Sequence, residues 1–335
     1  MKEINYGEIG TILLFGGGEI LGHVALKLKE KGLPVFVATS TRYITERINS
    51  LNFDEFLIEN NIKFEMTSDI NSNSKIIEMI KEDSLGISIG APWIFKKEFI
   101  DIFRGRLLNC HPRNLPRNRG AGGYSWMILN GEKESAALLH LIEPGIDTGE
   151  IVKREDFLFP ESCKIPLDYE KYSTEKIKCF LELFIDDLIQ RKTFKLVSQD
   201  ESKSTYFPRL HTLTQGLINW DWTAEEIICF INAFDDSYCG ASTYYRSKKV
   251  FIKKVSESKE KENFHPFLAG LVYRIHKNKV FIATKDGGIV VSEIKNEEGS
   301  SILEKLRVGK RFFTPYENLE GAKRIHPVYT PDGLK

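Results

Sequence analysis

The chain has 335 residues, of which 41% are hydrophobic and 28% charged, and this composition excludes a disordered, collagenous or fibrous protein. Its 47 Lys and Arg balance 47 Asp and Glu, which argues against a protein that coats nucleic acid or a membrane surface through its net charge. At this length we expect one large domain or two modest ones.

The first part of the chain alternates short apolar runs with helical patterns. Apolar strands are predicted at residues 11–15, 34–38, 85–89, 106–110 and 135–142, and helices at residues 19–30, 45–52, 53–60, 74–83 and 173–192. This alternation predicts a doubly wound, Rossmann-like α/β domain with a parallel sheet and right-handed crossovers.

The pattern changes after residues 190–211, which are polar and irregular and predict a linker. An amphipathic helix is expected at residues 223–234, with Thr223 as its N-cap. Short strands follow at residues 241–245, 250–255, 270–276, 279–284 and 288–294. Their spacing predicts a small OB-like β-barrel. We therefore expect a domain over residues 1–205 and a smaller one over residues 206–335.

Charge and cysteines add expectations about partners and compartment. From residue 246 to the end, 19 Lys and Arg face 11 Asp and Glu, a net +8, which suits an anionic ligand, RNA or an ordinary solvated surface. The first ten residues lack a signal-peptide pattern, and no apolar run approaches the ~18 residues of a membrane span. Five cysteines without a CxxC pair indicate reduced thiols in a cytoplasmic protein.

The turn Gly16-Gly17-Gly18 follows the first strand but does not fit a dinucleotide fingerprint. Leu21 stands where the third glycine is required, and Gly22 comes one position late. The next strand ends in Thr and Ser, with no acid to bind a ribose diol. We expect instead a tight turn that lines a cleft or contacts a phosphate through its backbone N–H groups.

A second polar stretch lies at the end of another predicted strand. Asn109 and His111 are two residues apart, so both side chains project to one face, while Cys110 points the other way into the core. The carboxyl end of a strand is where open parallel sheets bind ligands. Further on, a Pro-Gly turn delivers Asp147 between glycines.

These elements together resemble a known signature. Asn109-x-His111, then Leu115-Pro116-x-x-Arg119-Gly120, then Ile146-Asp147-Thr148-Gly149 is similar to the pattern of the formyltransferases that use N10-formyltetrahydrofolate. The resemblance extends over nearly the whole chain. It implies a catalytic domain followed by the barrel-like domain of the longer members, with Asn109, His111 and Asp147 as the catalytic trio.

The resemblance also implies a pterin site beside the trio. Its positions here are Trp93, Ile94 and Phe95 after one strand, and Glu143, Gly145, Ile146 and Asp147 in the turn. Apolar side chains would cover the ring, and backbone N–H and C=O groups would bind its edge.

The residue types suit formyl transfer. A primary amine attacks the formyl carbon, and the resulting oxyanion needs hydrogen-bond donors, for which we expect the Asn109 amide and a protonated His111. His111 would carry a proton from the amine to the folate N10. Asp147 would hold the imidazolium, raise the pKa of His111 and position a water. The spacing of His, Cys, Asp and Glu shows no metal-ligand cluster, so we expect no metal.

Three acceptors fit this family. The glycinamide ribonucleotide enzymes resemble the first domain alone, which disfavours them. The methionyl-tRNA enzymes share the two-domain layout, and the +8 C-terminal third suits RNA. However, they carry a basic, glycine-rich insertion after the second strand, whereas residues 39–60 here contain only two arginines. The sequence Ala-Gly-Gly-Tyr-Ser-Trp after Arg119-Gly120 also departs from the Ala-Pro common in the tRNA enzymes.

We therefore favour a nucleotide-linked amino sugar (dTDP-, UDP- or GDP-linked) over methionyl-tRNA. Arg113, Arg117 and Arg119 would meet its diphosphate, Tyr124 or Trp126 its base, and Gly17 a phosphate. Resemblance to the sugar enzymes implies a homodimer that acts in lipopolysaccharide O-antigen or surface-glycan synthesis, with neither nucleic acid nor membrane as partner. A non-catalytic folate or nucleotide sensor is a third alternative, although a binding module would not need all three catalytic groups.

Overall fold

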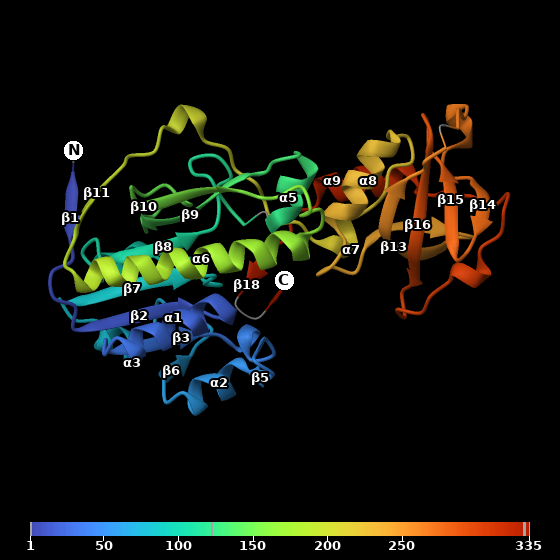
Figure 1. Cartoon of the computed structure of the whole chain (residues 1–335). Coiled ribbons are helices and arrows are strands. Elements are labelled where there is room, and N and C mark those ends of the chain that lie inside the picture. The colour runs from blue at the N-terminus through green and yellow to red at the C-terminus, as the bar shows by residue number, and fades with distance from the viewer. Residues whose placement is uncertain (1, 122, 261, 331–332, 335) are drawn as a thin grey trace.

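The computed structural model describes residues 2–121, 123–260, 262–330 and 333–334. Met1 and Lys335, the outer limits of the two predicted domains, lie outside these ranges. Figure 1 shows an α/β body joined to a smaller β-rich body. The predicted fold class, a Rossmann-like domain followed by an OB-like barrel, is confirmed.

A seven-stranded sheet forms the centre of the N-terminal body. Its strand order is β10-β9-β8-β7-β2-β3-β6. The strands are β2 (Thr11–Gly16), β3 (Val35–Thr39), β6 (Lys63–Met66), β7 (Ser84–Ile89), β8 (Leu107–His111), β9 (Glu134–Leu141) and β10 (Ile151–Leu158). The first five are mutually parallel, β9 runs antiparallel to β8, and β10 runs antiparallel to β9. The order reverses between β2 and β7, so a ligand crevice is expected at the carboxyl ends of these strands.

Helices cover both faces of this sheet. They are α1 (Gly18–Glu30), α2 (Phe53–Glu59), α3 (Ser74–Met79), α4 (Lys97–Ile102), α5 (Gly123–Leu129) and α6 (Pro166–Ile189). Alternate residues of β2 serve two cores: Ile12 and Leu14 pack on the side of α1 and α6, whereas Leu13 and Phe15 pack on the side of α4. A strand buried on both faces needs a continuous apolar run, which residues 11–15 supply.

The helix predicted at residues 45–52 is wrong. The segment forms a hairpin of β4 (Arg47–Ile48) and β5 (Leu51–Asn52). Asn49 and Ser50 between them have positive φ angles of 48° and 74°. Two successive left-handed residues make a hairpin turn and interrupt a helix, which explains the error. The helix prediction for the following residues is confirmed by α2.

The C-terminal body is a curled antiparallel sheet with the order β14-β15-β16-β13-β12-β17. Its strands are β12 (Ala241–Tyr245), β13 (Lys248–Glu257), β14 (Val272–His276), β15 (Lys279–Ala283), β16 (Gly288–Asn296) and β17 (Phe312–Phe313). Its two edges meet, because Phe312 N donates to Gly270 O and Val272 N donates to Lys310 O, each over 2.8 Å. This closure satisfies backbone groups that an open edge would expose. The helices of this body are α7 (Thr212–Gln215), α8 (Ala224–Ala233) and α9 (Tyr316–Arg324), and β18 (Tyr329–Thr330) then pairs antiparallel with β19 (Gly333–Leu334).

The two bodies share one apolar cluster. Met127 and Ile128 of α5 pack with Ile227, Ile231 and Phe234 of the α8 region. The Ser125 hydroxyl also donates to Ala233 O over 2.7 Å. The second body therefore packs directly on the helix that follows the Arg119-Gly120 loop.

The predicted linker is more ordered than its polar sequence suggests. It contains β11 (Thr193–Lys195), which pairs with β1 (Glu3–Asn5). Single bridges then join Val197 to Ile151 and Tyr206 to Arg119. The boundary between residues 205 and 206 stays a prediction. Among the described residues, no helix is long and apolar enough to cross a membrane.

Candidate active site

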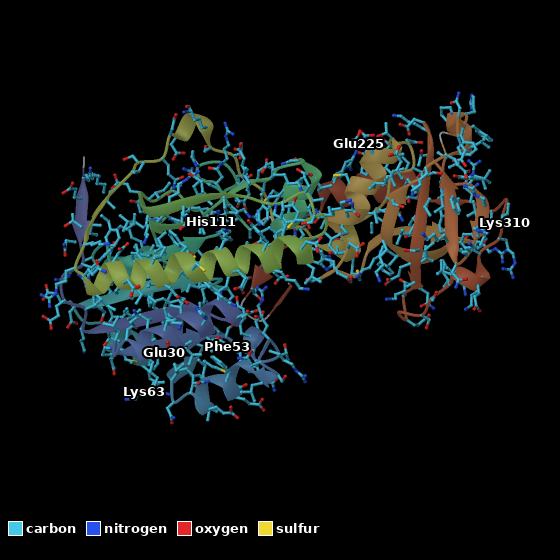
Figure 2. All side chains as sticks on the ribbon, viewed as in Figure 1. Glu30, Phe53, Lys63, His111, Glu225 and Lys310 are labelled. Atoms are coloured by element: carbon cyan, nitrogen blue, oxygen red, sulfur yellow. The ribbon has the colours of Figure 1, made fainter. Side chains whose placement is uncertain are left out.

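The structure brings the three predicted catalytic side chains together. Asn109 and His111 lie at the carboxyl end of β8, and Asp147 lies in the loop after β9. Asn109 Nδ2 is 3.4 Å from Asp147 Oδ1, and His111 Nδ1 is 3.8 Å from Asp147 Oδ2. Figure 2 places His111 inside the N-terminal body. Residues 38 positions apart in sequence thus face one small region.

His140 is a fourth member that the sequence analysis did not single out. It lies opposite Asn109 in the antiparallel pair of β8 and β9. Its Nε2 atom is 3.1 Å from Asn109 Nδ2 and 3.5 Å from Asp147 Oδ1. The pairing register of β8 and β9 places His140 there. In the sequence it lies shortly before Asp147, but that position alone gave no sign of a role in the site.

Backbone carbonyls fix the proton positions on both imidazoles. His111 Nε2 is 3.1 Å from Asn118 O, and His140 Nδ1 is 2.8 Å from Leu141 O. A carbonyl only accepts, so both of these ring nitrogens carry protons. In the neutral tautomers, His111 Nδ1 and His140 Nε2 therefore turn lone pairs toward the Asp147 carboxylate and the Asn109 amide.

Burial decides the charge of His111. The ring is 6% exposed, and burial lowers its pKa to about 4, an effect that the neighbouring His140 and Arg113 reinforce. Asp147 raises the pKa of His111 as expected, but less than burial lowers it. The protonated His111 expected from the sequence is thus a neutral imidazole near pH 7, with its Nδ1 lone pair free to accept a proton.

Asp147 remains ionised despite its burial. Desolvation raises the pKa of this carboxyl, but the neighbouring imidazoles of His140 and His111 and the N–H of Gly120 together bring the pKa well below its usual range. Gly120 N donates to Asp147 Oδ2 over 2.8 Å. The Leu115–Gly120 loop therefore contributes a backbone donor to the site.

Three of these groups also have the chemistry of metal ligands. His111, His140 and Asp147 each offer one atom, and the three atoms lie within 4.8 Å of one another. The spacing of these residues in sequence gave no sign of this cluster. In the present arrangement Asn109 donates to the His140 nitrogen that would bind a cation.

Arg113 lies two residues beyond His111 and is only 6% exposed. Among the described residues, its guanidinium makes no hydrogen bond or ion pair, and it lies over the Tyr124 ring, with 5.6 Å from the guanidinium carbon to the ring centroid. Burial lowers the pKa of Arg113. The carboxylates of Glu132 and Asp147 oppose this shift through their charge, but neither forms an ion pair with Arg113.

The other two loop arginines differ from Arg113. Arg117 is exposed on the surface. Arg119 is 7% exposed and pairs bidentately with Glu201, at 2.9 and 2.7 Å. Of the three arginines predicted to meet a diphosphate, Arg113 is therefore the one that is buried and unpaired.

The two aromatic candidates near this loop are packed on the protein side. The Tyr124 hydroxyl bonds to Ser173, and its ring lies 6.1 Å from that of Phe159. Trp126 donates from Nε1 to Pro208 O over 2.8 Å and lies 5.4 Å from the Phe207 ring. Each ring is half-buried and keeps some surface free for a ligand.

The segments predicted to bind a pterin follow β7 and β9, the two strands on either side of β8. Trp93 is buried and donates to Ser68 O, and Phe95 lies against Phe99. Ile94 is 83% exposed and Ile146 is 55% exposed. In the turn after β9, Glu143 and Gly145 are exposed as well. Two exposed apolar side chains thus stand on the loops that flank the site.

Gly17 lies buried at the same edge of the sheet. A Cβ atom there would approach Tyr43 to 2.2 Å, so only glycine fits without movement. Gly17 also precedes α1 and makes no side-chain cap, which leaves the first N–H groups of this helix available. The two alternatives for this turn, a cleft wall or a phosphate contact, are both compatible with this geometry.

Comparison with family models assigns both bodies. Residues 11–161 match the model described as formyl transferase, and residues 212–304 match the model described as formyl transferase, C-terminal domain. Both halves of the sequence resemblance are confirmed.

Individual relatives fall into two groups. Methionyl-tRNA formyltransferases from Clostridium tetani and Rickettsia bellii are 26% and 28% identical, over 72% and 73% of this chain and 76% of each relative. Among solved structures, WlaRD, a sugar 3N-formyl transferase, has a TM-score of 0.66 at 23% identity and covers 85% of this chain and 98% of its own. An N-formyltransferase from Helicobacter canadensis has a TM-score of 0.66 at 20% identity and covers 84% and 98%.

Proposed function

The chain belongs to the formyl transferase family and is an N-formyltransferase, and we propose that it transfers the formyl group of N10-formyltetrahydrofolate to the primary amine of a nucleotide-linked amino sugar. The observation that carries the chemistry is the convergence of Asn109, His111 and Asp147 on one region. The observation that carries the acceptor class is the buried, unpaired guanidinium of Arg113 close to that region.

The proposed reaction starts from neutral His111. The amine attacks the formyl carbon, a C–N bond forms, and the carbonyl oxygen becomes an oxyanion to which the Asn109 amide donates. His111 Nδ1 accepts the proton that the amine loses. The resulting imidazolium faces Asp147, whose carboxylate stabilises it across 3.8 Å. The bond from the formyl carbon to N10 then breaks, and His111 returns the proton to N10.

The donor would lie against the loops that flank the crevice. Ile94 and Ile146 offer exposed apolar surface for the pterin, Trp93 and Phe95 support one loop, and Glu143 and Gly145 offer backbone groups of the other. The solved structures of WlaRD and of the Helicobacter canadensis enzyme contain 5-N-formyl-THF and folinic acid, respectively, which supports a formylated folate as donor.

The acceptor would present its diphosphate to Arg113, with Arg117, Arg119 and Gly17 as further candidate contacts. Arg113 supports a compact anion, because a guanidinium pairs bidentately with phosphate oxygens. Tyr124 and Trp126 are the candidates for contact with the base. The same two solved structures contain dTDP and dTDP-3-aminofucose, respectively.

The runner-up acceptor is methionyl-tRNA. Its support is the sequence relatives, which are methionyl-tRNA formyltransferases. However, a methionyl-tRNA formyltransferase from Clostridium thermocellum superposes with a TM-score of 0.50, lower than the sugar enzymes. The short β4–β5 hairpin stands after the second strand, where the tRNA enzymes carry a basic insertion. Both points favour the sugar.

One assay separates these acceptors. The enzyme is incubated with N10-formyltetrahydrofolate and either a panel of dTDP-, UDP- and GDP-linked amino sugars or initiator tRNA charged with methionine, and formylated product is detected by mass. We expect product from one or more sugars. Formylation of the tRNA alone would overturn the acceptor assignment. Calorimetric titration with dTDP, UDP and GDP then identifies the nucleotide.

The remaining expectations follow from the sugar assignment. We propose a homodimer in the cytoplasm that supplies formylated sugar for lipopolysaccharide O-antigen or a related surface glycan, with no nucleic acid or membrane as partner. Size-exclusion chromatography with light scattering tests the dimer. A folate sensor without activity is the alternative from another class, and turnover that depends on His111 would exclude it.

A further inference from the structure

The polar segment between the two bodies returns to the candidate active site. After β11 it passes the turn that carries Asp147, and then the loop that carries Arg119. Gln199 Nε2 donates to Asp147 O and to Gly149 O, each over 2.8 Å. The Gln199 amide therefore binds the backbone carbonyls of the two residues that flank Thr148.

The other end of the same amide binds the second loop. Gln199 Oε1 accepts from Arg119 Nη2 over 2.8 Å and from Arg119 Nε over 3.3 Å. Arg119 is further anchored by Glu201, and its backbone pairs with Thr205 and Phe207. The Gln199 side chain thus uses both of its N–H donors and its oxygen to connect two loops that are distant in sequence.

Both loops control the orientation of a catalytic group. Asp147 has a φ of 52°, a left-handed conformation that costs energy for a residue with a Cβ and needs surrounding contacts to persist. The Arg119 loop supplies Gly120 N to the Asp147 carboxylate and Asn118 O to His111. A change in the distance between the loops would move the carboxylate relative to the imidazole.

We propose that Gln199 is a positioning residue for formyl transfer: it joins the Asp147 turn to the Arg119 loop and so holds the Asp147 carboxylate toward His111. It touches neither the reacting carbon nor its substituents in this scheme. The inference rests on the proposed roles of His111 and Asp147 and adds a residue that the sequence placed in a linker.

The test uses Gln199→Met, which keeps the side-chain length and removes every hydrogen bond. Gln190→Met is the matched control, because Gln190 is exposed at the end of α6. Gln199→Glu is a second variant, which keeps an oxygen for Arg119 but removes both donors. Steady-state kinetics use N10-formyltetrahydrofolate and the acceptor that the panel above selects, and thermal unfolding is followed for each variant.

We expect kcat of Gln199→Met to fall about 10- to 100-fold, in line with the cost of misplacing a catalytic group by about 1 Å. KM for donor and acceptor should stay within about twofold, since no substrate contact is lost. If Gln199 acts through Asp147, adding Gln199→Met to Asp147→Asn should lower kcat no further. Gln190→Met should behave as the wild type.

Each outcome decides the proposal. Unchanged kcat in Gln199→Met, or an equal loss in the Asp147→Asn background, would refute the positioning role. If Gln199→Met does not fold, the same kcat and KM criteria are applied to Gln199→Glu. If neither variant folds, Gln199 is a purely structural residue and the proposal is overturned. The proposed function fails separately, if His111→Ala retains turnover.

Discussion

Replacing Arg113 by Met should weaken binding of the acceptor while leaving the fold at least as stable. The side chain is 6% exposed and, within the described part of the chain, bonds to no acceptor. Its cation–π contact with Tyr124 contributes about 1–2 kcal/mol. Burial of a guanidinium without an ion pair in contact costs several kcal/mol, so removal of the charge should not lower the unfolding temperature.

Binding of the nucleotide sugar, in contrast to the stability of the fold, should become weaker. A hydrogen bond to a charged group contributes about 1.5–3 kcal/mol, and each 1.4 kcal/mol is about tenfold in affinity. Loss of Arg113 should therefore raise KM for the nucleotide sugar about 10- to 100-fold. Because Arg113 lowers the pKa of His111, the variant should also lose activity at a higher pH than the wild type as the solution is acidified.

The measurements are acceptor KM, the Kd of the free nucleotide by calorimetry, and the thermal midpoint. Arg104→Met is the matched control, because Arg104 is an exposed arginine just after α4, outside the loop that carries Arg113. Its KM should change less than about twofold, as expected for a surface contact. An Arg113→Met protein that unfolds several degrees earlier and binds the nucleotide normally would mean that Arg113 only supports Tyr124.

Four further predictions concern the catalytic groups and stability. His111→Ala should lower kcat by about 10²- to 10⁴-fold, the usual contribution of a general base, while the Kd for a folate analogue stays the same; near-normal turnover would exclude the proton transfer through His111. The pKa of His111 is about 4 in the folded state and about 6.5 in the unfolded state, so between these pH values the unfolded state binds one more proton. The free energy of unfolding should therefore fall by roughly 3 kcal/mol as the pH drops from 6.5 to 4. Urea titrations should show that His111→Asn lacks this component, and an equal pH dependence in both proteins would contradict the assignment. His140→Ala should lower kcat more than it raises KM, because Asn109 loses the acceptor that orients its amide; a pure KM effect in steady-state kinetics would place His140 in substrate binding instead. Thr223→Ala should lower the free energy of unfolding by about 1 kcal/mol, because the Thr223 hydroxyl caps α8 by accepting from Glu226 N. A chemical denaturation curve identical to that of the wild type would show that this cap does not contribute to stability.

Much of the fold followed from local patterns in the sequence. Residues 11–15 had to be a strand buried on both faces because they form a continuous apolar run between turn signals. Thr223 and Glu226 specified the start of α8, because capping depends on residues three positions apart. The spacing of Asn109 and His111 placed both on one face of a strand, and the resemblance to the formyltransferase signature implied that Asp147 joins them in one site.

The tertiary structure alone decided which groups meet and in what protonation state. His140 enters the site through antiparallel register, Gln199 through a segment that looked like a linker, and Arg113 is buried over the Tyr124 ring. Burial turned the expected imidazolium of His111 into a neutral base. These properties depend on desolvation and on contacts between residues that are remote in sequence, so they arise only when the chain is packed, whereas strand period, capping and turn chemistry are already set by neighbouring residues.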